Sequence, residues 1–226
     1  MERWSGRVAL VTGASAGIGA AIVRELVKNG LIVVGLARRA ELVEELSVEL
    51  KGAPGKLHAF KGDASKEEDI LAAFDWVKKN LGRIDVLVNN AGVLYTTSLT
   101  EAFKLMKEKG VDDGHIIHIN SVHANNLTDV NDLTQYDASK QAVTVLTEGL
   151  RWELVQLGSK IRVTSIKPGC VETNTLRIAL HHDEEVFANI AALKGKDIAD
   201  AVIYTLSTPP HVQVHEITIK PVGEKF

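Results

Sequence analysis

Three residues near the middle of the chain have side chains that could carry out acid–base chemistry together: Ser121, Tyr136 and Lys140. A tyrosine hydroxyl has a pKa of about 10, which is too high for a base near neutral pH. A lysine four residues later shares its helical face, and the ammonium group would lower that pKa. Tyr136 could then take the proton of an alcohol or protonate a carbonyl, while Ser121 hydrogen-bonds the same oxygen. The alternative is an exposed amphipathic pair, because helices produce this spacing by chance.

A glycine-rich turn near the start of the chain is typical of a phosphate-binding loop. The segment 12–19, with sequence TGASAGIG, directly follows the apolar run Arg7–Thr12. Glycines let the backbone approach a pyrophosphate, whose charge then lies at the positive N-terminus of the next helix. Tight strand-to-helix turns also use glycine for steric reasons alone. The residues expected to contact the phosphates are Gly13, Ser15, Gly17, Ile18 and Gly19.

Two arginines follow the second apolar run and indicate which dinucleotide is bound. NAD sites usually carry an acidic residue at this point, whereas this chain has Ala37 followed by Arg38 and Arg39. Guanidinium groups are forked, permanently charged donors that suit a 2′-phosphate. A solvated basic pair at a helix start is the alternative, although positive charge is mildly unfavourable there. The pair therefore favours NADP over NAD.

Two further turns are predicted at the same edge of the sheet. Asp63 and Ala64 follow the third apolar run, and Asn90, Ala91 and Gly92 follow the fourth. Each is an ordinary turn composition by itself. Because open α/β sheets bind ligands at the carboxyl ends of their strands, the recurrence indicates one shared site.

Short β-branched runs alternate with longer segments of helical period, which predicts an α/β fold with a Rossmann-type, doubly wound parallel sheet. About seven strands are expected, with helices on both faces, in one domain spanning residues 1–226. The expected strands are Arg7–Thr12, Leu31–Ala37, Leu57–Phe60, Ile84–Val88, His115–Ile119, Arg162–Ile166 and Glu216–Ile219. The expected helices are Ala20–Asn29, Ala40–Leu50, Lys66–Asn80, Glu101–Lys109, Tyr136–Leu157 and Asp197–Leu206. Their apolar periodicity predicts that Ile70, Leu71, Phe74 and Val77 face inward, and that Ala142, Val143, Leu146, Leu150 and Leu154 face the sheet.

Composition excludes several classes of protein. The 226 residues carry a net charge of −3, which argues against a nucleic-acid partner. No apolar run approaches the ~18 residues of a membrane span, and the first residues do not resemble a signal peptide. The single cysteine, Cys170, excludes an internal disulfide and a cysteine-based metal cluster, and we expect no metal site. A cytoplasmic location is expected.

Taken together, five motifs in order resemble the short-chain dehydrogenase/reductase superfamily over essentially the whole chain. They are the glycine turn 12–19, the segment 89–92, Ser121, the YDASK segment 136–140 and the PGCVET segment 168–173. The resemblance implies NADP(H), hydride transfer between an alcohol and an aldehyde or ketone, and a homodimer or homotetramer. It implies catalytic roles for Ser121, Tyr136 and Lys140, with Tyr136 and Lys140 also contacting the cofactor.

The same resemblance implies further cofactor contacts. Asp63 would contact the adenine and Asn90 the adjoining ribose. The PGCVET segment would frame the nicotinamide, and the residues expected to do so are Pro168, Gly169, Val171 and Thr173.

Shorter segments narrow the resemblance to the insect farnesol dehydrogenases and a vertebrate group related to them. These segments are MERW at 1–4, DDGHII at 112–117 and TEGLR at 147–151. The implied reaction is the interconversion of farnesol and farnesal, or of another small apolar alcohol and its carbonyl. A broad carbonyl or ketosteroid reductase is the alternative.

One region departs from the superfamily pattern. Only 22 residues separate Gly92 from His115, and the nine predicted helical residues span about 13 Å, which is short for a crossover. The superfamily places a fourth catalytic residue, an asparagine, in this region, and no residue here matches it. The stretch near Thr100 reflects either a true deletion or a disordered segment missing from the sequence. A true deletion leaves open a non-catalytic nucleotide-binding protein.

Overall fold

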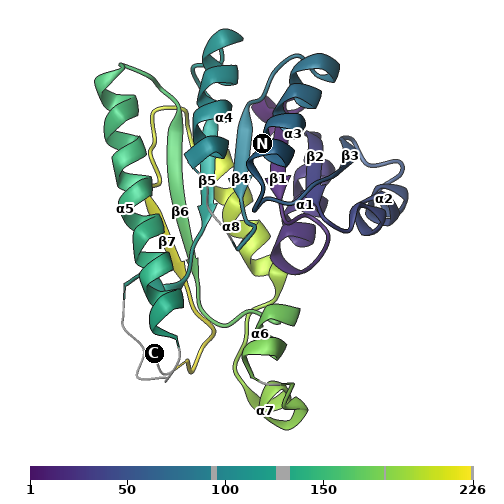
Figure 1. Ribbon diagram of the computed structural model, residues 1–226, viewed down its shortest axis with the longest axis vertical. Coiled ribbons are helices and arrows are strands. Elements are labelled where there is room, and N and C mark those ends of the chain that lie inside the picture. Colours follow the sequence, from purple (N-terminus) through teal and green to yellow (C-terminus); the bar gives the residue numbers. More distant parts are fainter. Residues whose placement is uncertain (93–95, 126–132, 181, 225–226) are drawn as a thin grey trace.

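A seven-stranded, all-parallel sheet with strand order β3-β2-β1-β4-β5-β6-β7 forms the centre of the protein. The structure is a computed structural model that describes residues 1–92, 96–125, 133–180 and 182–224 (Figure 1). The strands are β1 Val8–Thr12, β2 Ile32–Ala37, β3 Lys56–Lys61, β4 Val86–Asn89, β5 His115–Ile119, β6 Arg162–Pro168 and β7 Glu216–Ile219. The predicted Rossmann-type sheet is confirmed.

Helices cover both faces of this sheet. The long ones are α1 Gly17–Lys28, α2 Ala40–Glu49, α3 Glu67–Asn80, α4 Thr96–Glu108, α5 Thr134–Gln156 and α8 Gly195–Ser207. Shorter elements are η1 Glu2–Trp4, η2 Val122–Ala124, α6 Asn174–Ala179 and α7 Glu184–Asn189. In Figure 1, α6 and α7 project beyond the end of the sheet after β6.

Two apolar clusters hold the layers together. One joins α1, α2 and α8 to the sheet through fully buried side chains such as Ile22, Leu26 and Val202. The other joins α3 and α4 to the opposite face, with Phe74 and Met106 among its members. Central strands buried on both faces need near-continuous apolar sequence, which explains the β-branched runs.

The structure corrects the predicted length of α4. This helix starts at Thr96 instead of Glu101 and has 13 residues, so it spans about 20 Å and completes the crossover between β4 and β5. It runs without a break through the region near Thr100. The expected difficulty of building a crossover was therefore wrong, because Thr and Ser at the start of the segment join the helix despite their low propensity.

Two predictions of helix faces were also wrong. In α5, Ala142 and Leu146 were expected to face the sheet but are exposed, and Thr147 is buried there instead. In α3, Leu71 is 41% exposed, because Ile70 and Phe74 define the buried stripe. A shift of one residue rotates a side chain by about 100°, which moves it off a narrow stripe.

Candidate active site

The glycine turn between β1 and α1 has the backbone geometry that the sequence predicts. Gly13 and Gly17 have φ angles of +70° and +56°, a region that side chains disfavour. A Cβ on Gly19 would collide with the carbonyl oxygen of Gly13. Ser15 lies in the turn itself and Ile18 in the first turn of α1. The segment therefore presents a closely approachable backbone at a helix N-terminus.

Asn90, the residue that follows β4, holds this turn in place through hydrogen bonds. Its Nδ2 donates to the carbonyl oxygens of Thr12 at 2.9 Å and Gly13 at 3.3 Å. In return, Thr12 Oγ1 accepts from the backbone nitrogens of Asn90 at 3.1 Å and Ala91 at 3.0 Å. Both amide hydrogens of Asn90 are thus used inside the protein, so its side chain holds the glycine turn against the end of β4.

The expected contacts around the adenosine lie at the adjacent strand ends. Arg38 and Arg39 are exposed after β2, and neither makes a hydrogen bond or ion pair with another described residue. Asp63 Oδ1 accepts from Ser65 N at 2.9 Å and Ser65 Oγ at 2.8 Å, and these bonds lower the pKa of the carboxyl group. Ala64 is half-buried beside it. The two guanidinium groups are available to a ligand anion.

The three candidate catalytic residues come together where β5 ends and α5 begins. Tyr136 and Ser121 are hydrogen-bonded. The Nζ of Lys140 lies 5.5 Å from the centre of the Tyr136 ring and donates a long, 3.5 Å bond to the carbonyl oxygen of Ile119. The Tyr136 side chain is 41% exposed, so a substrate can reach it.

The electrostatics of Tyr136 differ from the simplest expectation. Burial raises its pKa above the ordinary value, and the charge of Asp137 raises it further, while the hydrogen bond with Ser121 opposes both. Burial also lowers the pKa of Lys140. The charge of Lys140 is not among the causes of this pKa shift of Tyr136 in the protein alone. A positive charge brought by a ligand would favour the phenolate.

A cavity of about 450 Å³ is lined by one of the three candidate catalytic residues, Lys140. Its polar lining includes Lys140 and Ser139, and its apolar lining includes Ile119, Val143 and Leu146. Ala91 and Gly92 of the predicted cofactor segment also line it. The volume lies within the range of small-molecule sites, and a mostly apolar lining with a few polar groups is typical of them.

The turn after β6 is anchored by a residue that sequence reasoning missed. Pro168 and Val171 are buried, and the side chain of Thr173 caps α6. Thr173 also lies beside Gly17, because a Cβ placed on Gly17 would be 3.2 Å from Thr173 Cγ2.

Glu224 is the residue that anchors this turn. Its Oε1 accepts from the backbone nitrogen of Cys170 at 3.0 Å, and a Cβ on Gly169 would collide with this carboxylate. Burial, reinforced by Glu224, raises the pKa of the Cys170 thiol to about 11, so it is no nucleophile.

Sequence reasoning also missed His123 and Asp137. Both neighbour candidate catalytic residues in the chain, and the structure pairs them at 2.6 Å. No motif indicates such a pair, because the two residues are 14 positions apart and belong to different elements.

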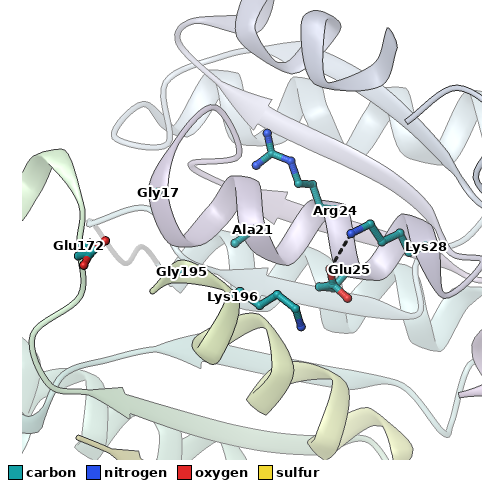
Figure 2. A pocket seen from close by; sticks show the side chains of 8 residues that line it. All are labelled: Gly17, Ala21, Arg24, Glu25, Lys28, Glu172, Gly195 and Lys196. Carbon is teal, nitrogen blue, oxygen red and sulfur yellow. Dashed lines mark hydrogen bonds and ion pairs between the residues drawn. The ribbon is translucent and has the colours of Figure 1, made fainter. Parts of the chain in front are cut away.

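A second pocket, of about 290 Å³, lies between α1 and α8 (Figure 2). Its lining is dominated by charged side chains that are already paired, such as Lys28 with Glu25 at 3.1 Å. None of the three candidate catalytic residues lines it. Among the described residues no three His, Cys, Asp or Glu side chains are grouped to hold a metal ion, and no helix is long and apolar enough to cross a membrane.

Comparisons with known proteins agree with this geometry. The family model described as short chain dehydrogenase matches residues 7–113 and 94–184. Farnesol dehydrogenase of Aedes aegypti is 49% identical, with all of both chains covered, and dehydrogenase/reductase SDR family member 11 of Homo sapiens is 42% identical, covering 99% of this chain and 97% of that protein.

Solved structures are similar over nearly the whole chain. A metagenomic short-chain oxidoreductase in complex with NADP has a TM-score of 0.79 at 29% identity, covering 98% of this chain and 99% of the other. A short-chain dehydrogenase/reductase from Serratia marcescens has a TM-score of 0.81 at 29% identity, covering 96% and 98%.

The comparison also locates the unusual region. The alignment to the Aedes aegypti protein spans 251 positions, whereas this chain has 226 residues, so at least 25 positions have no counterpart here. The family model matches in two pieces that overlap at residues 94–113, which places the interruption at α4. Matches on both sides of it cover the glycine turn, Ser121, Tyr136 and Lys140. The chain belongs to the short-chain dehydrogenase/reductase family.

Proposed function

We propose that this protein is an NADP(H)-dependent oxidoreductase, a single domain that interconverts an alcohol and an aldehyde or ketone. The observation that carries the proposal is the meeting of Ser121, Tyr136 and Lys140, together with a cavity of about 450 Å³ that Lys140 lines. This meeting lies at the same end of the sheet as the glycine turn. A proton donor, an oxygen-binding hydroxyl and a cation thus surround one point that a small molecule can reach.

Each residue has a distinct role in the proposed reaction. The bound cofactor supplies or accepts the hydride. Tyr136 donates a proton to the carbonyl oxygen during reduction and removes the alcohol proton during oxidation. Ser121 hydrogen-bonds the same oxygen and stabilises the charge that develops on it. Lys140 holds the nicotinamide ribose and lowers the pKa of Tyr136 once the cofactor is in place.

The preference for NADP(H) over NAD(H) rests on Arg38 and Arg39. Both guanidinium groups are exposed at the end of β2 and make no hydrogen bond or ion pair with a described residue, although Arg38 lies close enough to Asp63 to interact with its charge. The metagenomic relative whose structure contains NADP shares the fold over 98% of this chain. Further contacts are proposed for the glycine turn, for Asp63, Ala64, Asn90, Ala91 and Gly92, and for Pro168, Gly169, Val171 and Thr173.

The proposed substrate pair is farnesol and farnesal. Support comes from the 49% identity to a farnesol dehydrogenase and from the apolar walls that Ile119, Val143 and Leu146 give the cavity. A broader carbonyl or ketosteroid reductase is the alternative among enzymes, because an apolar pocket discriminates only weakly between apolar substrates of similar size.

We also propose that the protein forms a homodimer or homotetramer in the cytoplasm. The outer face of α5 exposes Val145 (72%), Trp152 (58%) and Val155 (61%), and such a stripe is typical of a surface that binds a partner. A lone cysteine remains reduced in a cytoplasmic environment.

The test follows nicotinamide absorbance while NADP⁺ or NADPH is offered with isoprenoid alcohols, aldehydes and ketosteroids. Turnover of farnesol above the others supports the proposal, and turnover of ketosteroids alone supports the broader reductase. Tight NADPH binding without any turnover would identify a non-catalytic nucleotide-binding protein, which the missing 25 positions make a specific alternative. The intact mass of the natural protein, compared with 24.5 kDa, shows whether those positions are truly absent.

A further inference from the structure

A buried carboxylate lies directly beside the candidate catalytic tyrosine. Asp137 is the residue after Tyr136 and is only 1% exposed, in the first turn of α5. Its Oδ1 lies 2.6 Å from Nδ1 of His123. Removing a carboxylate from water is costly unless a charged or hydrogen-bonding partner compensates. The imidazole of His123 supplies that compensation, and the N-terminal end of the helix adds to it.

The same histidine contacts both other parts of the proton-transfer site. Its backbone nitrogen donates to Ser121 Oγ at 3.3 Å. Its ring packs edge to face against the ring of Tyr136, with centroids 5.3 Å apart and an angle of 78° between the planes. One side chain thus links the segment that carries Ser121 to the helix that carries Tyr136.

The surroundings explain why such a link is needed. Helix α5 makes its most extensive contact with η2, the short element that contains His123, and makes less with β6. Helix α4 packs against α3. Contacts with η2 therefore contribute to the orientation of the first turns of α5, in addition to the hydrogen bonds further along the helix.

We propose that His123, held by the carboxylate of Asp137, is a positioning residue that fixes the Tyr136 ring and the Ser121 hydroxyl relative to each other. The proposal rests on the proposed function, because it assigns the pair to the same proton transfer. Asp137 accepts the Nδ1 hydrogen, which sets the tautomer and the orientation of the imidazole. The oriented ring then limits the rotation of Tyr136.

The electrostatic effect of the pair gives a readout that a purely structural contact would not move. The charged or titratable side chains of the described residues that face Tyr136 are Lys140 and Asp137 on α5 and His123 on η2. Asp137 raises the pKa of Tyr136. Removing its charge while keeping its shape, in Asp137→Asn, should therefore lower that pKa.

The experiment compares Asp137→Ala, Asp137→Asn and His123→Phe with the wild-type protein. Asp137→Ala and His123→Phe should lower kcat roughly 10- to 100-fold, because small displacements of reacting groups have effects of this size, while the KM for NADPH stays within about threefold. Asp137→Asn keeps an acceptor for Nδ1 and should restore most of kcat. Its pH profile for alcohol oxidation should shift to lower pH, since the phenolate forms more readily.

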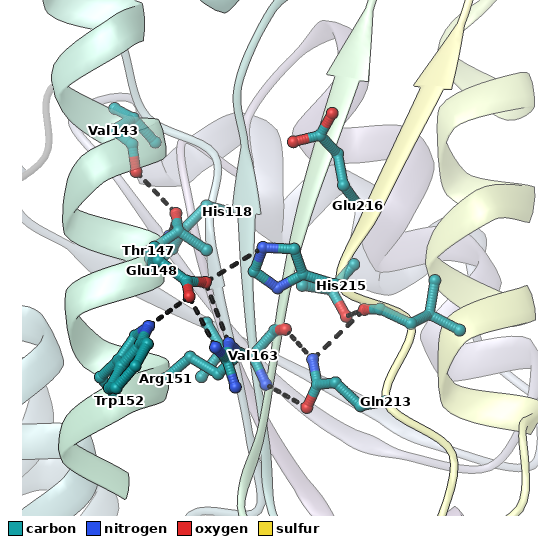
Figure 3. A network of polar contacts seen from close by, with 12 residues as sticks. His118, Val143, Thr147, Glu148, Arg151, Trp152, Val163, Gln213, His215 and Glu216 are labelled. Atoms are coloured by element: carbon teal, nitrogen blue, oxygen red, sulfur yellow. Dashed lines mark hydrogen bonds and ion pairs between the residues drawn. The ribbon is translucent and has the colours of Figure 1, made fainter. Parts of the chain in front are cut away.

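A matched control exists on the same helix. Glu148 lies several turns from Tyr136 and pairs with His215 at 3.2 Å, as well as with Arg151 and Trp152 on its own helix (Figure 3). Glu148→Gln and His215→Phe each remove one member of a carboxylate–histidine contact on the same helix, in which the carboxylate also binds Arg151 and Trp152. They should leave kcat and the pH profile unchanged.

An ultraviolet titration of tyrosinate, with Tyr136→Phe as the reference, follows the pKa of Tyr136 without turnover. If the wild-type protein turns over no substrate, the proposed function fails, whereas the titration of Asp137→Asn still decides the inference. Wild-type kcat and an unchanged Tyr136 titration in the Asp137 and His123 variants would overturn it. Melting curves identify a variant that fails to fold, and Asp137→Asn then remains the deciding comparison.

Discussion

The two faces of the sheet are covered in different ways. On one face, α1 and α8 bury apolar side chains such as Leu26, Ile198 and Val202. On the other, α5 is the longest helix, with 23 residues, yet only Asp137, Thr147 and Leu154 are buried. Apolar contact is non-directional, whereas hydrogen bonds fix distance and angle. Helices α1 and α8 therefore contribute mainly apolar burial, as α3 and α4 do beside α5, whereas α5 itself contributes mainly hydrogen bonds that fix its orientation.

The contacts beneath α5 illustrate the second kind of packing. His118 Nδ1 lies 2.7 Å from Thr147 Oγ1, which itself donates to the carbonyl oxygen of Val143 at 2.6 Å. The hydrogen between His118 and Thr147 must therefore belong to Nδ1. Asn120 Nδ2 donates to Thr144 Oγ1 at 3.1 Å in the same layer. These bonds set the rotation of α5, and hence the direction of Tyr136.

The largest expected effect concerns the chemistry on the polar face. Tyr136→Phe removes the proton donor and keeps the ring, so turnover should fall roughly 100- to 10,000-fold, the usual contribution of general acid–base catalysis. NADPH affinity should remain within a few-fold. Steady-state kinetics and fluorescence titration measure the two quantities. An equal loss of cofactor binding would contradict the assigned role.

Lys140→Ala provides the contrast to this variant. Because Lys140 is proposed to serve both the ribose and the pKa of Tyr136, its loss should weaken NADPH binding and turnover together. If NADPH affinity were unchanged in this variant, the proposed contact between Lys140 and the ribose would be contradicted.

The next prediction compares how much an apolar side chain of α1 and one of α5 contribute to the free energy of unfolding. Leu26→Ala in α1 deletes a fully buried side chain and should lower the free energy of unfolding by about 2–5 kcal/mol. Leu146→Ala in α5, where the side chain is 38% exposed, should change it by less than about 1 kcal/mol. Urea denaturation of both variants measures the difference. A large loss in Leu146→Ala would show that this part of α5 is covered by another copy of the chain.

Periodicity and turn composition were enough to predict the sheet, because each central strand is apolar on both faces and ends in a turn motif. They were not enough for α5, where Ala142 and Leu146 were expected inside. A hydrophobic stripe predicts the buried face of a helix only if that face is apolar, and here Thr147 occupies it. The rotation depends on His118, a residue on a different element.

The same limit applies to the candidate site. Ser121, Tyr136 and Lys140 were predicted because their chemistry is visible in spacing and motif. The missed contacts join residues that are far apart in the sequence. His123 and Asp137 are 14 positions apart, and Glu224 is 54 positions from Cys170, which it contacts in the turn after β6. No local pattern encodes such pairs. The short α4 was underestimated because its first turn is made of residues with low helix propensity.

The polar layer should also make stability depend on pH. Burial lowers the pKa of His118 to about 4, whereas the unfolded chain has an ordinary value near 6.5. The unfolded state therefore binds the proton more readily, and the stabilisation present above pH 6.5 is lost as the pH falls toward 4. For a shift of this size the loss is about 3 kcal/mol. His118→Asn should show a correspondingly weaker dependence on pH in urea denaturation between pH 7 and pH 4.

His115 is buried in the same strand, and its pKa is also lowered. It titrates in both the wild type and the His118→Asn variant, so the difference between the two isolates His118. Identical curves would mean that His118 is solvated and that the layer beneath α5 is open to water.

The smallest expected effect on stability concerns the residues after β2, which take part neither in the apolar core nor in the hydrogen bonds beneath α5. Arg38 and Arg39 are exposed and make no hydrogen bond or ion pair with a described residue, so replacing both with Gln should leave the free energy of unfolding nearly unchanged. A charge-assisted contact with the 2′-phosphate contributes about 1.5–3 kcal/mol, so NADPH affinity should fall roughly tenfold to a hundredfold. NADH affinity should hardly change, because it lacks that phosphate. Parallel titrations with the two cofactors measure this difference, and a wild-type protein that is faster with NADH at matched concentrations would refute the preference for NADP(H). If the double variant instead lost affinity for both cofactors equally, the arginines would act by stabilising the glycine turn. Their role would then be to orient a neighbouring segment, as the hydrogen bonds beneath α5 do.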